Sequence, residues 1–350
     1  MSFEIEPARA AAIAQGLLCW YDENKRDLPW RHTGDPYAIW VSETMAQQTR
    51  IAFLTAYYER FMARFPTVQS LAEADTTAVL KAWEGLGYYS RARNMQNAAR
   101  QVMAMFGGRV PRTKKELLTL PGIGEYTAGA ILSIAYGIPA PAVDGNVLRV
   151  FSRLENSDAD INLPPARRQA ADFVAAVMPN HRAGCFTQAL MELGALVCLP
   201  KTPDCGNCPV AAVCRARQWG REGELPFKSA KKSPQLLEKT IFILRNRDGE
   251  ILMRRRTERM LSGLWEFHMA EGALTEADAR AWLRQAGWKV QSIGSLGEAR
   301  HVFTHQIWQM RGYDCRVEGN WSADETMWVK ESDIKELPIP AALRFYVQKI

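Results

Sequence analysis

Two carboxylic acids are the residues in this sequence whose type and surroundings point most directly to catalysis. Glu43 lies among apolar residues of a predicted helix, where burial would raise its pKa and let it act as a general acid. Asp144 stands at the predicted start of another helix, where backbone N–H groups would keep it ionised. Taken alone, Glu43 is more often a helix-surface glutamate, and Asp144 is equally well a plain helix cap. Held in unlike environments, the two would form an acid and anion pair.

A glycine-rich turn precedes Asp144 and suits a phosphate group. Residues 121–124 read Pro-Gly-Ile-Gly and lead into a predicted helix over 125–136. Such a turn presents unpaired N–H groups and the positive end of the helix dipole. Eight basic residues against the single acid Glu84 precede it within residues 81–115. A basic run is often only a solvated helix face, but together with this turn it favours a polyanion such as DNA.

Four cysteines lie close together and suggest a metal centre. Their spacing is C-x6-C-x2-C-x5-C, formed by Cys198, Cys205, Cys208 and Cys214. Zinc sites usually consist of two close pairs that a longer segment separates. One close pair with two outlying cysteines is nearer to an iron–sulfur arrangement. We therefore expect a [4Fe–4S] cluster in the loop 198–214, and zinc is the alternative.

Composition limits the class of protein. The chain has 350 residues, 47% of them hydrophobic, and a net charge of +6, which fits two folded domains and an anionic partner. The N-terminus lacks the basic and apolar pattern of a signal peptide, and no apolar run approaches the roughly 20 residues that span a bilayer. We expect a cytoplasmic protein without membrane contact, in which cysteines are ligands or free thiols and not disulfides.

The elements that would position these residues fall into two domains of different class. Residues 1–217 show helical periodicity throughout, residues 218–238 are a polar linker, and residues 239–350 mix strands and helices. Helices are expected over 7–24, 37–65 with a possible break, 66–83, 90–106, 113–119, 125–136, 145–155, 165–178 and 186–197. In the second domain we expect strands at 239–244, 251–255, 302–303, 307–312, 314–317 and 327–329, and helices beginning at Thr275 and Ala341.

At this point the motifs resemble a known family. The glycine turn is similar to a helix-hairpin-helix element, and together with Asp144 and the cysteine loop it resembles the endonuclease III superfamily of DNA glycosylases. Within that superfamily the chain resembles the MutY-type adenine glycosylases. The stretches that carry this resemblance are residues 28–31 (LPWR), 40–49 (WVSETMAQQT), 85–93 (GLGYYSRAR), 144–147 (DGNV) and 301–305 (HVFTH).

The resemblance implies a role for each candidate catalytic residue. Glu43 would protonate the adenine ring and then assist water, while Asp144 would face the cationic sugar, either beside the attacking water or as a transient covalent adduct. Tyr126 stands where the lyases of the superfamily carry their Schiff-base lysine, and Asn146 would orient water or Asp144. Residues 116–200 contain no lysine, so strand cleavage through an amine is not expected.

The resemblance also implies which residues would contact the flipped adenine and the DNA. An aromatic face with amide, carboxylate and guanidinium groups suits a flipped adenine, and we expect this pocket to be formed by Trp30, Arg31, Gln188 and Glu192. Gln48, Leu86 and Tyr88 would fill the gap that the extruded base leaves. The full set of expected DNA contacts is Gln48, Thr49, Leu86, Tyr88, Arg91, Gly122 and Gly124.

The C-terminal domain resembles a Nudix-like fold. Residues 263–287 lack the acidic array that would hold Mg²⁺ in a pyrophosphatase, so recognition is the better hypothesis. The 8-oxoguanine base presents an N7–H donor that a hydroxyl can accept. We therefore expect Phe303, Thr304 and His305 to read 8-oxoguanine, with Thr304 at a place where the family usually has serine.

The sequence thus predicts a monofunctional, monomeric glycosylase that excises adenine opposite 8-oxoguanine or G in double-stranded DNA. Three alternatives remain: an endonuclease III-like pyrimidine glycosylase/lyase, a non-catalytic iron–sulfur DNA-binding protein or redox sensor, and a Nudix hydrolase with a DNA-binding partner domain.

Overall fold

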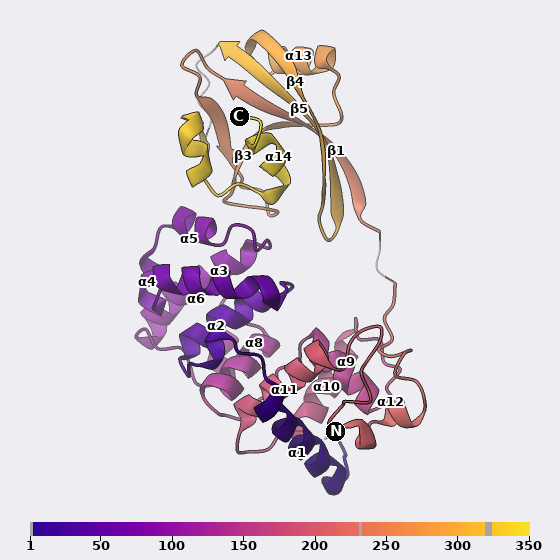
Figure 1. Cartoon of the computed structure of the whole chain (residues 1–350). Coiled ribbons are helices and arrows are strands. Elements are labelled where there is room, and N and C mark those ends of the chain that lie inside the picture. Colours follow the sequence, from indigo (N-terminus) through magenta and orange to yellow (C-terminus); the bar gives the residue numbers. More distant parts are fainter. Residues whose placement is uncertain (1–2, 231–232, 319–323) are drawn as a thin grey trace. The chain divides into compact units, whose positions relative to one another are not determined.

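The structure, a computed structural model, describes residues 3–230, 233–318 and 324–350 (Figure 1). It forms two compact units. The first comprises Met1–Glu73 and Asn94–Ala230, and the second comprises Ala74–Arg93 and Lys231–Ile350. A short segment from the helical half of the sequence therefore belongs to the unit that contains the C-terminal sheet. Residues 231 and 232 of the predicted linker lie outside the described residues, and the domain boundary at 217 stays a prediction.

Helices make up the regular structure of the first unit in the described residues, as the periodicity predicted. Asp35 caps the second helix by accepting a hydrogen bond from the Tyr37 N–H, with Pro36 at the first helical position. The α-helices whose residues lie within or reach into this unit are α1 (Pro7–Asn24), α2 (Pro36–Ala46), α3 (Ile51–Arg64), α4 (Val68–Glu73), α6 (Ser90–Phe106), α7 (Lys114–Leu117), α8 (Glu125–Ala130), α9 (Gly145–Leu154), α10 (Pro164–Val177), α11 (Ala183–Leu196) and α12 (Arg215–Gln218).

Three expected helices differ in their limits. The expected helix over 37–65 breaks at residues 47–50, between α2 and α3. The expected helix over 66–83 is two helices, α4 and α5 (Thr76–Ala82), because Asp75 caps the second one. The helix after the glycine turn continues from α8 through one π-helical segment, η2 (Ile131–Ala135). Shorter 3₁₀ elements are η1 (Pro29–Arg31) and η3 (Ala211–Val213).

The core of the first unit brings α1, α9, α10 and α11 together through buried aliphatic and aromatic side chains. Phe151 and Phe173 pack against each other there, with ring centroids 5.5 Å apart. Gly194 of α11 allows a close approach, because a Cβ at this position would lie 2.5 Å from the Cβ of Asn146. This packing fixes the first turn of α9, where Asp144 and Asn146 lie.

The second unit contains one mixed six-stranded sheet in the order β4-β5-β1-β3-β2-β6. β1 pairs in parallel with β5, and the other neighbours are antiparallel. The predicted hairpin at residues 246–249 joins β1 to β2. The strands are β1 (Gln235–Arg245), β2 (Ile251–Arg255), β3 (Trp265–Glu271), β4 (Lys289–Val302), β5 (Gln306–Glu318) and β6 (Thr326–Val329).

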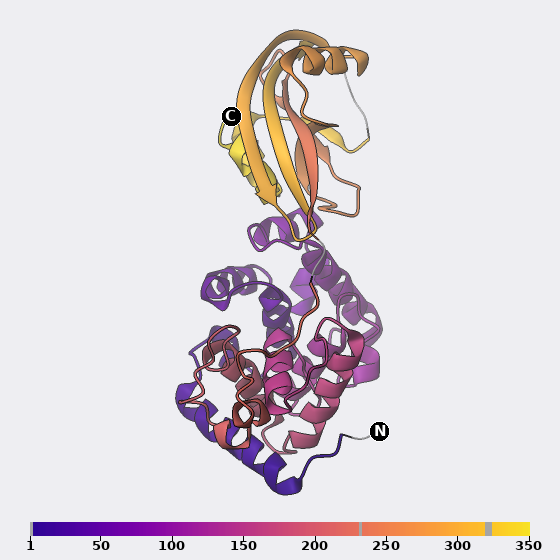
Figure 2. The ribbon, with the colours of Figure 1, turned by 90° about the vertical axis from the view of Figure 1, so that its right-hand side faces the viewer.

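Helices cover both faces of this sheet (Figure 2). Successive strand residues point to opposite faces, so Phe242 packs with α13 (Glu276–Gln285) while Ile241 packs with the C-terminal helices. Those C-terminal elements are η4 (Glu331–Glu336), η5 (Ala341–Leu343) and α14 (Arg344–Val347). Because β1 is covered on both faces, its run from Thr240 to Leu244 is buried and apolar apart from Thr240.

The strand predictions for the second unit were incomplete. β3 was not expected, and β4 is fourteen residues long where only residues 302–303 were assigned to a strand. β4 is an edge strand with mostly exposed or half-buried residues, so it lacks a clean apolar alternation. The expected helix after Thr275 is confirmed, since the Thr275 hydroxyl accepts from the Asp278 N–H. In the described part of the chain, no helix combines the length and apolar character needed to cross a bilayer.

Candidate active site and cysteine centre

A large pocket in the first unit brings the four predicted catalytic residues together. Its volume is about 1230 Å³, and Glu43, Tyr126, Asp144 and Asn146 all line it. Glu43 comes from α2, Tyr126 from the start of α8, and the other two from the start of α9. Residues distant in sequence therefore meet in one pocket, where the Tyr126–Glu43 hydrogen bond joins α8 to α2.

Glu43 is a buried carboxyl group with its pKa in the neutral range. Its residue is 8% exposed, and burial raises its pKa to about 7. The Tyr126 hydroxyl donates a hydrogen bond to the carboxyl group and counteracts this rise. The negative charge of Asp144 adds to the rise, whereas Arg31 opposes it. A carboxyl group with this pKa can hold a proton near neutral pH and transfer it.

Asp144 caps α9, as predicted. Its Oδ1 accepts a hydrogen bond of 2.7 Å from the Val147 N–H, and its Oδ2 accepts one of 3.2 Å from the Asn146 amide. Burial raises the pKa of this carboxyl group, while the backbone N–H groups of Val147 and Asn146 lower it. These donors direct fixed partial positive charges at the carboxylate, which is the arrangement that favours its ionised form.

The pocket is also lined by a second buried glutamate, Glu192, in a contrasting environment. Glu192 is 1% exposed and is bound by two arginines. Arg26 donates from its backbone N–H, Nε and Nη2, and Arg31 donates from Nη1 and Nη2, at 2.7 to 3.1 Å. Despite the opposing effect of burial, these hydrogen bonds lower the pKa of Glu192 to about 2. Sequence reasoning did not identify Arg26, because a lone exposed-looking arginine before residue 28 carries no motif.

Several residues that line the pocket offer groups that can contact a base. Trp30, Arg31, Gln188 and Glu192 all line the pocket. The Nε of Arg31 is buried and has no acceptor among the described residues, so it is a donor available to a ligand. Trp30 is 7% exposed and packs on Tyr58 with ring centroids 5.2 Å apart. Trp30 is therefore both a core residue and part of the pocket wall.

One lysine does reach the pocket, although residues 116–200 contain none. Lys114 lines it at the start of α7, and its Nζ lies 2.6 Å from Glu125 Oε2. Lys114 precedes the glycine turn and lies outside the lysine-free stretch 116–200, so it was not expected in the pocket. Lys114 and Glu125 are both well exposed, with side chains 50% and 70% accessible. The ion pair with Glu125 engages the Lys114 amine, whereas an amine nucleophile needs a free, activated nitrogen.

The predicted DNA contacts divide between the two units. Gln48, Thr49, Gly122 and Gly124 line the pocket of the first unit. Gly122 has φ +80°, and a Cβ there would lie 2.8 Å from the Asn94 Cβ, so only glycine fits this turn. Leu86, Tyr88 and Arg91 belong to the second unit. Gln48 and Tyr88 are both in the left-handed region, with φ 58° and 47°, a conformation that concentrates at functional sites.

Arg91 holds the chain around Tyr88 in place through hydrogen bonds and ring contacts. Its Nη2 donates to the carbonyl groups of Leu86 and Gly87 at 3.1 and 3.2 Å. The guanidinium also lies over the rings of Trp83 and Tyr88, and burial lowers its pKa to about 10. These contacts give Arg91 a clear structural role, and its contact with DNA stays a prediction.

The predicted lesion-reading residues form the tip of the β4–β5 hairpin. The Phe303 N–H donates to the Gln306 carbonyl at 2.8 Å and closes the turn. The Phe303 ring packs between His301 and Trp308. Thr304 and His305 are exposed at the tip, and the Thr304 hydroxyl is in hydrogen-bond contact with the Tyr88 hydroxyl. The second unit thus brings one predicted DNA contact beside one predicted lesion contact.

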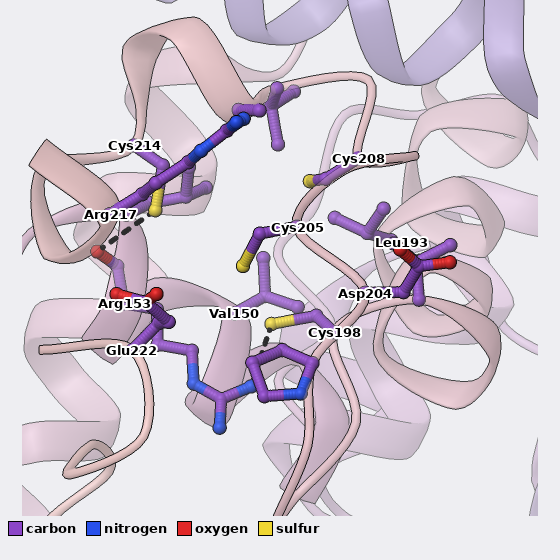
Figure 3. A pocket seen from close by; sticks show the side chains of 15 residues that line it. Val150, Arg153, Leu193, Cys198, Asp204, Cys205, Cys208, Cys214, Arg217 and Glu222 are labelled. Carbon is purple, nitrogen blue, oxygen red and sulfur yellow. Dashed lines mark hydrogen bonds between the residues drawn. The ribbon is translucent and has the colours of Figure 1, made fainter. Parts of the chain in front are cut away.

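The four clustered cysteines line one cavity (Figure 3). In the described residues, no three His, Cys, Asp or Glu side chains are arranged to bind a single metal ion. A zinc ion needs all its ligands around one point, whereas each cysteine of a four-iron cluster binds a different iron. Burial raises the pKa of the Cys208 thiol to about 11, so a positively charged group would be needed to ionise it. The four thiols are thus gathered around one cavity, where soft sulfur ligands could hold a metal centre.

Two buried arginines that sequence reasoning did not identify connect this loop to α9. Arg149 donates from Nε to the Cys198 carbonyl at 2.7 Å and from Nη2 to the Asn146 Oδ1 at 2.8 Å. Arg153 donates to the Cys198 Sγ at 3.2 Å and to the Leu199 and Pro200 carbonyls. Both are charged residues in α9, whose other buried residues are mostly apolar. Two arginines within such an apolar run are the sequence signal that could have indicated them.

Comparison with known proteins was made against families, curated sequences and solved structures. Residues 41–175 match the HhH-GPD superfamily of base excision DNA repair proteins, and residues 240–349 match the NUDIX domain. The chain is 33% identical over 403 residues to the adenine DNA glycosylase of Rattus norvegicus, covering 96% of this chain and 77% of that protein. It is 31% identical to the adenine DNA glycosylase of Buchnera aphidicola subsp. Baizongia pistaciae, covering 96% of both.

Solved structures resemble the first unit. A thermostable thymine-DNA glycosylase superposes with a TM-score of 0.56 and 28% identity, over 61% of this chain and 98% of the other. An endonuclease III trapped in a covalent complex with DNA superposes with a TM-score of 0.53 over 62% of this chain and 99% of the other. The second of these likenesses, at 22% identity, concerns the fold alone.

Proposed function

This chain belongs to the adenine DNA glycosylase family, and we propose that it hydrolyses the N-glycosidic bond of adenine mispaired with 8-oxoguanine or with G in double-stranded DNA. The proposal includes a monofunctional reaction in base excision repair, carried out by a cytoplasmic monomer. The observation that supports it most is Glu43, a buried carboxyl group with a pKa of about 7 in the same pocket as Asp144.

The two carboxyl groups suit the two charge problems of this reaction. Adenine leaves as a neutral molecule only if its ring is protonated, and Glu43 can hold that proton near neutral pH. The bond then breaks with positive charge on the sugar, and an anion close to that charge lowers the barrier. Asp144 is oriented for this role by the Val147 N–H and the Asn146 amide. Once ionised, Glu43 can take a proton from the attacking water.

The flipped adenine would lie in the pocket that Glu43 and Asp144 line. The unsatisfied Nε–H of Arg31 can donate to a ring nitrogen of the purine, and Trp30 and Gln188 add an aromatic edge and an amide. Glu192 keeps Arg26 and Arg31 in place through five hydrogen bonds. A flipped base requires rigid partners of this kind, because its unstacking already costs a few kcal/mol.

Reading of the opposite base is proposed for the second unit. Thr304 presents a hydroxyl at the exposed tip of the β4–β5 hairpin, and a hydroxyl can accept from the N7–H that distinguishes 8-oxoguanine from guanine. Tyr88 lies beside it and is 43% exposed, which suits an aromatic ring that enters the base stack.

We also propose a [4Fe–4S] cluster held by Cys198, Cys205, Cys208 and Cys214. The cluster would supply iron–thiolate bonds that cross-link the loop 198–214, and such bonds stabilise a folded loop. Arg153 would donate its hydrogen bond to a ligating sulfur, and Arg149 already holds the loop to Asn146. The as-purified protein should be brown and should contain iron, whereas a colourless protein loaded with zinc would exclude the cluster.

The function is tested with three duplexes, which contain A opposite 8-oxoguanine, A opposite G, or thymine glycol. We expect release of free adenine from the first two and strand breaks only after alkali. Release from thymine glycol with spontaneous nicking and borohydride trapping would instead identify a pyrimidine glycosylase/lyase. Binding without release from any duplex would identify a sensor. If trapping is observed, the Lys114→Ala variant shows whether the pocket lysine is the amine.

A further inference from the structure

The segment Ala74–Arg93 is held by the second unit at several points, although it belongs to the helical half of the sequence. It contains α5 and the turn with Leu86 and Tyr88, which are expected to enter the DNA stack. The contacts that attach this segment to the C-terminal sheet have no role in the chemistry described above. They come from two cations, Lys81 and Arg93, from one close packing contact and from the hydroxyl contact between Tyr88 and Thr304.

Lys81 binds the end of a C-terminal helix. Its Nζ donates to the carbonyl groups of Lys335 and Leu337, the latter at 3.2 Å. These carbonyls lie at the end of η4 and just beyond it, where helix carbonyls lack intrahelical partners and where a cation is favourable. Glu84 holds the same ammonium group at 2.7 Å. The Lys81 side chain is 26% exposed, so this contact is partly removed from water.

Arg93 fixes the other end of the segment. Its Nη1 donates to the carbonyl group of Ser262 in the loop before β3. The next residue, Gly263, has φ +78°, and a Cβ on it would lie 3.3 Å from Leu80 Cδ1. The loop is therefore packed against α5 with little free space. Burial lowers the pKa of Arg93, in keeping with a guanidinium that is enclosed on the loop.

The same loop is connected to the lesion-reading hairpin. Arg256 donates to the Met260 carbonyl at 3.1 Å and is itself bound by the buried Glu266. The side chain of Met260 contacts the amide of Gln306, which follows His305 at the hairpin tip. The connection is completed where Tyr88 and Thr304 meet through their hydroxyl groups. The segment is thus attached to the sheet at α5, at the loop before β3 and at the hairpin.

We propose that Lys81 is a positioning residue that sets discrimination between opposite bases, by holding the Leu86–Tyr88 turn in a fixed relation to the Thr304 hairpin. This inference rests on the proposed function, because it concerns how 8-oxoguanine is preferred over G. The Thr304 hydroxyl gains binding free energy from the N7–H donor only if it is held at hydrogen-bond distance. If the Leu86–Tyr88 turn and the Thr304 hairpin move relative to each other, the conformational entropy lost on ordering them cancels this gain. Guanine offers no N7–H donor to the Thr304 hydroxyl, so excision of adenine opposite G should depend on Lys81 much less than excision opposite 8-oxoguanine.

The test compares Lys81→Met with wild type in steady-state kinetics on duplexes containing A:8-oxoG and A:G. We expect the ratio of kcat/KM values, A:8-oxoG over A:G, to fall about tenfold, as for loss of a hydrogen bond from a charged donor, while the A:G value stays within about twofold. Lys81→Arg keeps a cationic donor and should restore most of the ratio. Lys330→Met removes an exposed positive charge from the same unit and should leave the ratio unchanged. An unchanged ratio in Lys81→Met overturns the proposal.

Amide hydrogen exchange separates this inference from the proposed function. In Lys81→Met, exchange of residues 76–93 should become faster in the free protein, while the strands β1 and β5 keep wild-type protection. Unchanged exchange across residues 76–93 would show that Lys81 holds nothing in place and would overturn the inference. If wild type released adenine from neither duplex, the proposed function would fail, and exchange alone would then decide whether Lys81 positions the segment.

Discussion

One pocket buries two glutamates whose hydrogen-bond partners differ, and their pKa values move in opposite directions. Glu43 of α2 accepts a hydrogen bond from the Tyr126 hydroxyl, and burial raises its pKa to about 7. Glu192 is also buried, but two guanidinium groups lower its pKa to about 2. The comparison shows that burial alone does not decide the charge of a carboxyl group. Because the partners differ, Glu43 can hold a transferable proton near neutral pH, whereas Glu192 stays ionised.

The second unit contains a similar arrangement around Glu266. Glu266 is fully buried and is bound by Arg254 and Arg256. These ion pairs connect β2, the loop after it and β3. Glu192 and Glu266 are therefore two buried carboxylates that each bind two arginines, and Glu192 is the one that lines the pocket of the first unit.

The largest expected effect is on Glu43. Glu43→Gln keeps the shape of the side chain and removes the transferable proton, so single-turnover adenine release should fall about 10³-fold, within the range for loss of a general acid. Binding to the mismatched duplex, measured by fluorescence anisotropy, should stay within a few fold. Glu59→Gln on the exposed face of α3 is the matched control. Activity retained in Glu43→Gln would remove this residue from the chemistry.

The next effect concerns the ion pairs. Glu192→Gln leaves two guanidinium groups without their anion, and breaking a buried pair in this way costs about 3 kcal/mol of unfolding free energy. We expect a lower urea midpoint together with a raised KM, because Arg31 loses its support. Glu266→Gln should lower the urea midpoint similarly but leave the KM for the A:G duplex unchanged. Equal effects of the two substitutions on KM would contradict the contrast between the two sites.

A smaller effect is expected in the pH dependence of stability. The folded-state pKa of Glu43, about 7, is above its unfolded value of about 4.5. Its protonated form therefore stabilises the fold fully below pH 4.5, and this contribution is lost as the pH rises through 7. Glu43→Gln cannot ionise, so it should exceed wild type by about 3 kcal/mol at pH 8 and match it at pH 4. Urea titrations at the two pH values measure the difference, and parallel stability curves would refute the raised pKa.

The smallest effect is a shift in a pH profile. The Tyr126 hydrogen bond favours ionised Glu43, so Tyr126→Phe should raise the pKa of Glu43 further. The basic limb of the kcat/KM profile, which begins near pH 7 in wild type, should move upward by less than about one unit. Activity at pH 6 should change little. A shift toward lower pH would mean that Tyr126 holds the protonated form instead.

Much of the site was predictable because each part has a local signature. Asp144 was expected as an N-cap and accepts from the Val147 N–H, and the hairpin at 246–249 and the Thr275 cap follow from short-range rules. Strand β4 was mostly missed because its residues are largely exposed and β5 alone pairs with it. Lys114 and Arg26 were missed because nothing in their immediate sequence shows which surface they line.

What the sequence determined by itself was the inventory: the helical and mixed halves, the glycine turn, the cysteine spacing, and the two carboxyl groups. These depend on backbone conformation and on residues a few positions apart, which local sequence specifies. Only the tertiary structure decided in which direction the pKa values of Glu43 and Glu192 move, that α5 belongs with the C-terminal sheet, and that Arg149 connects the cysteine loop to Asn146. The physical reason is that burial and charge pairing depend on side chains brought together from distant parts of the chain, and their effect falls steeply with distance in space, not in sequence.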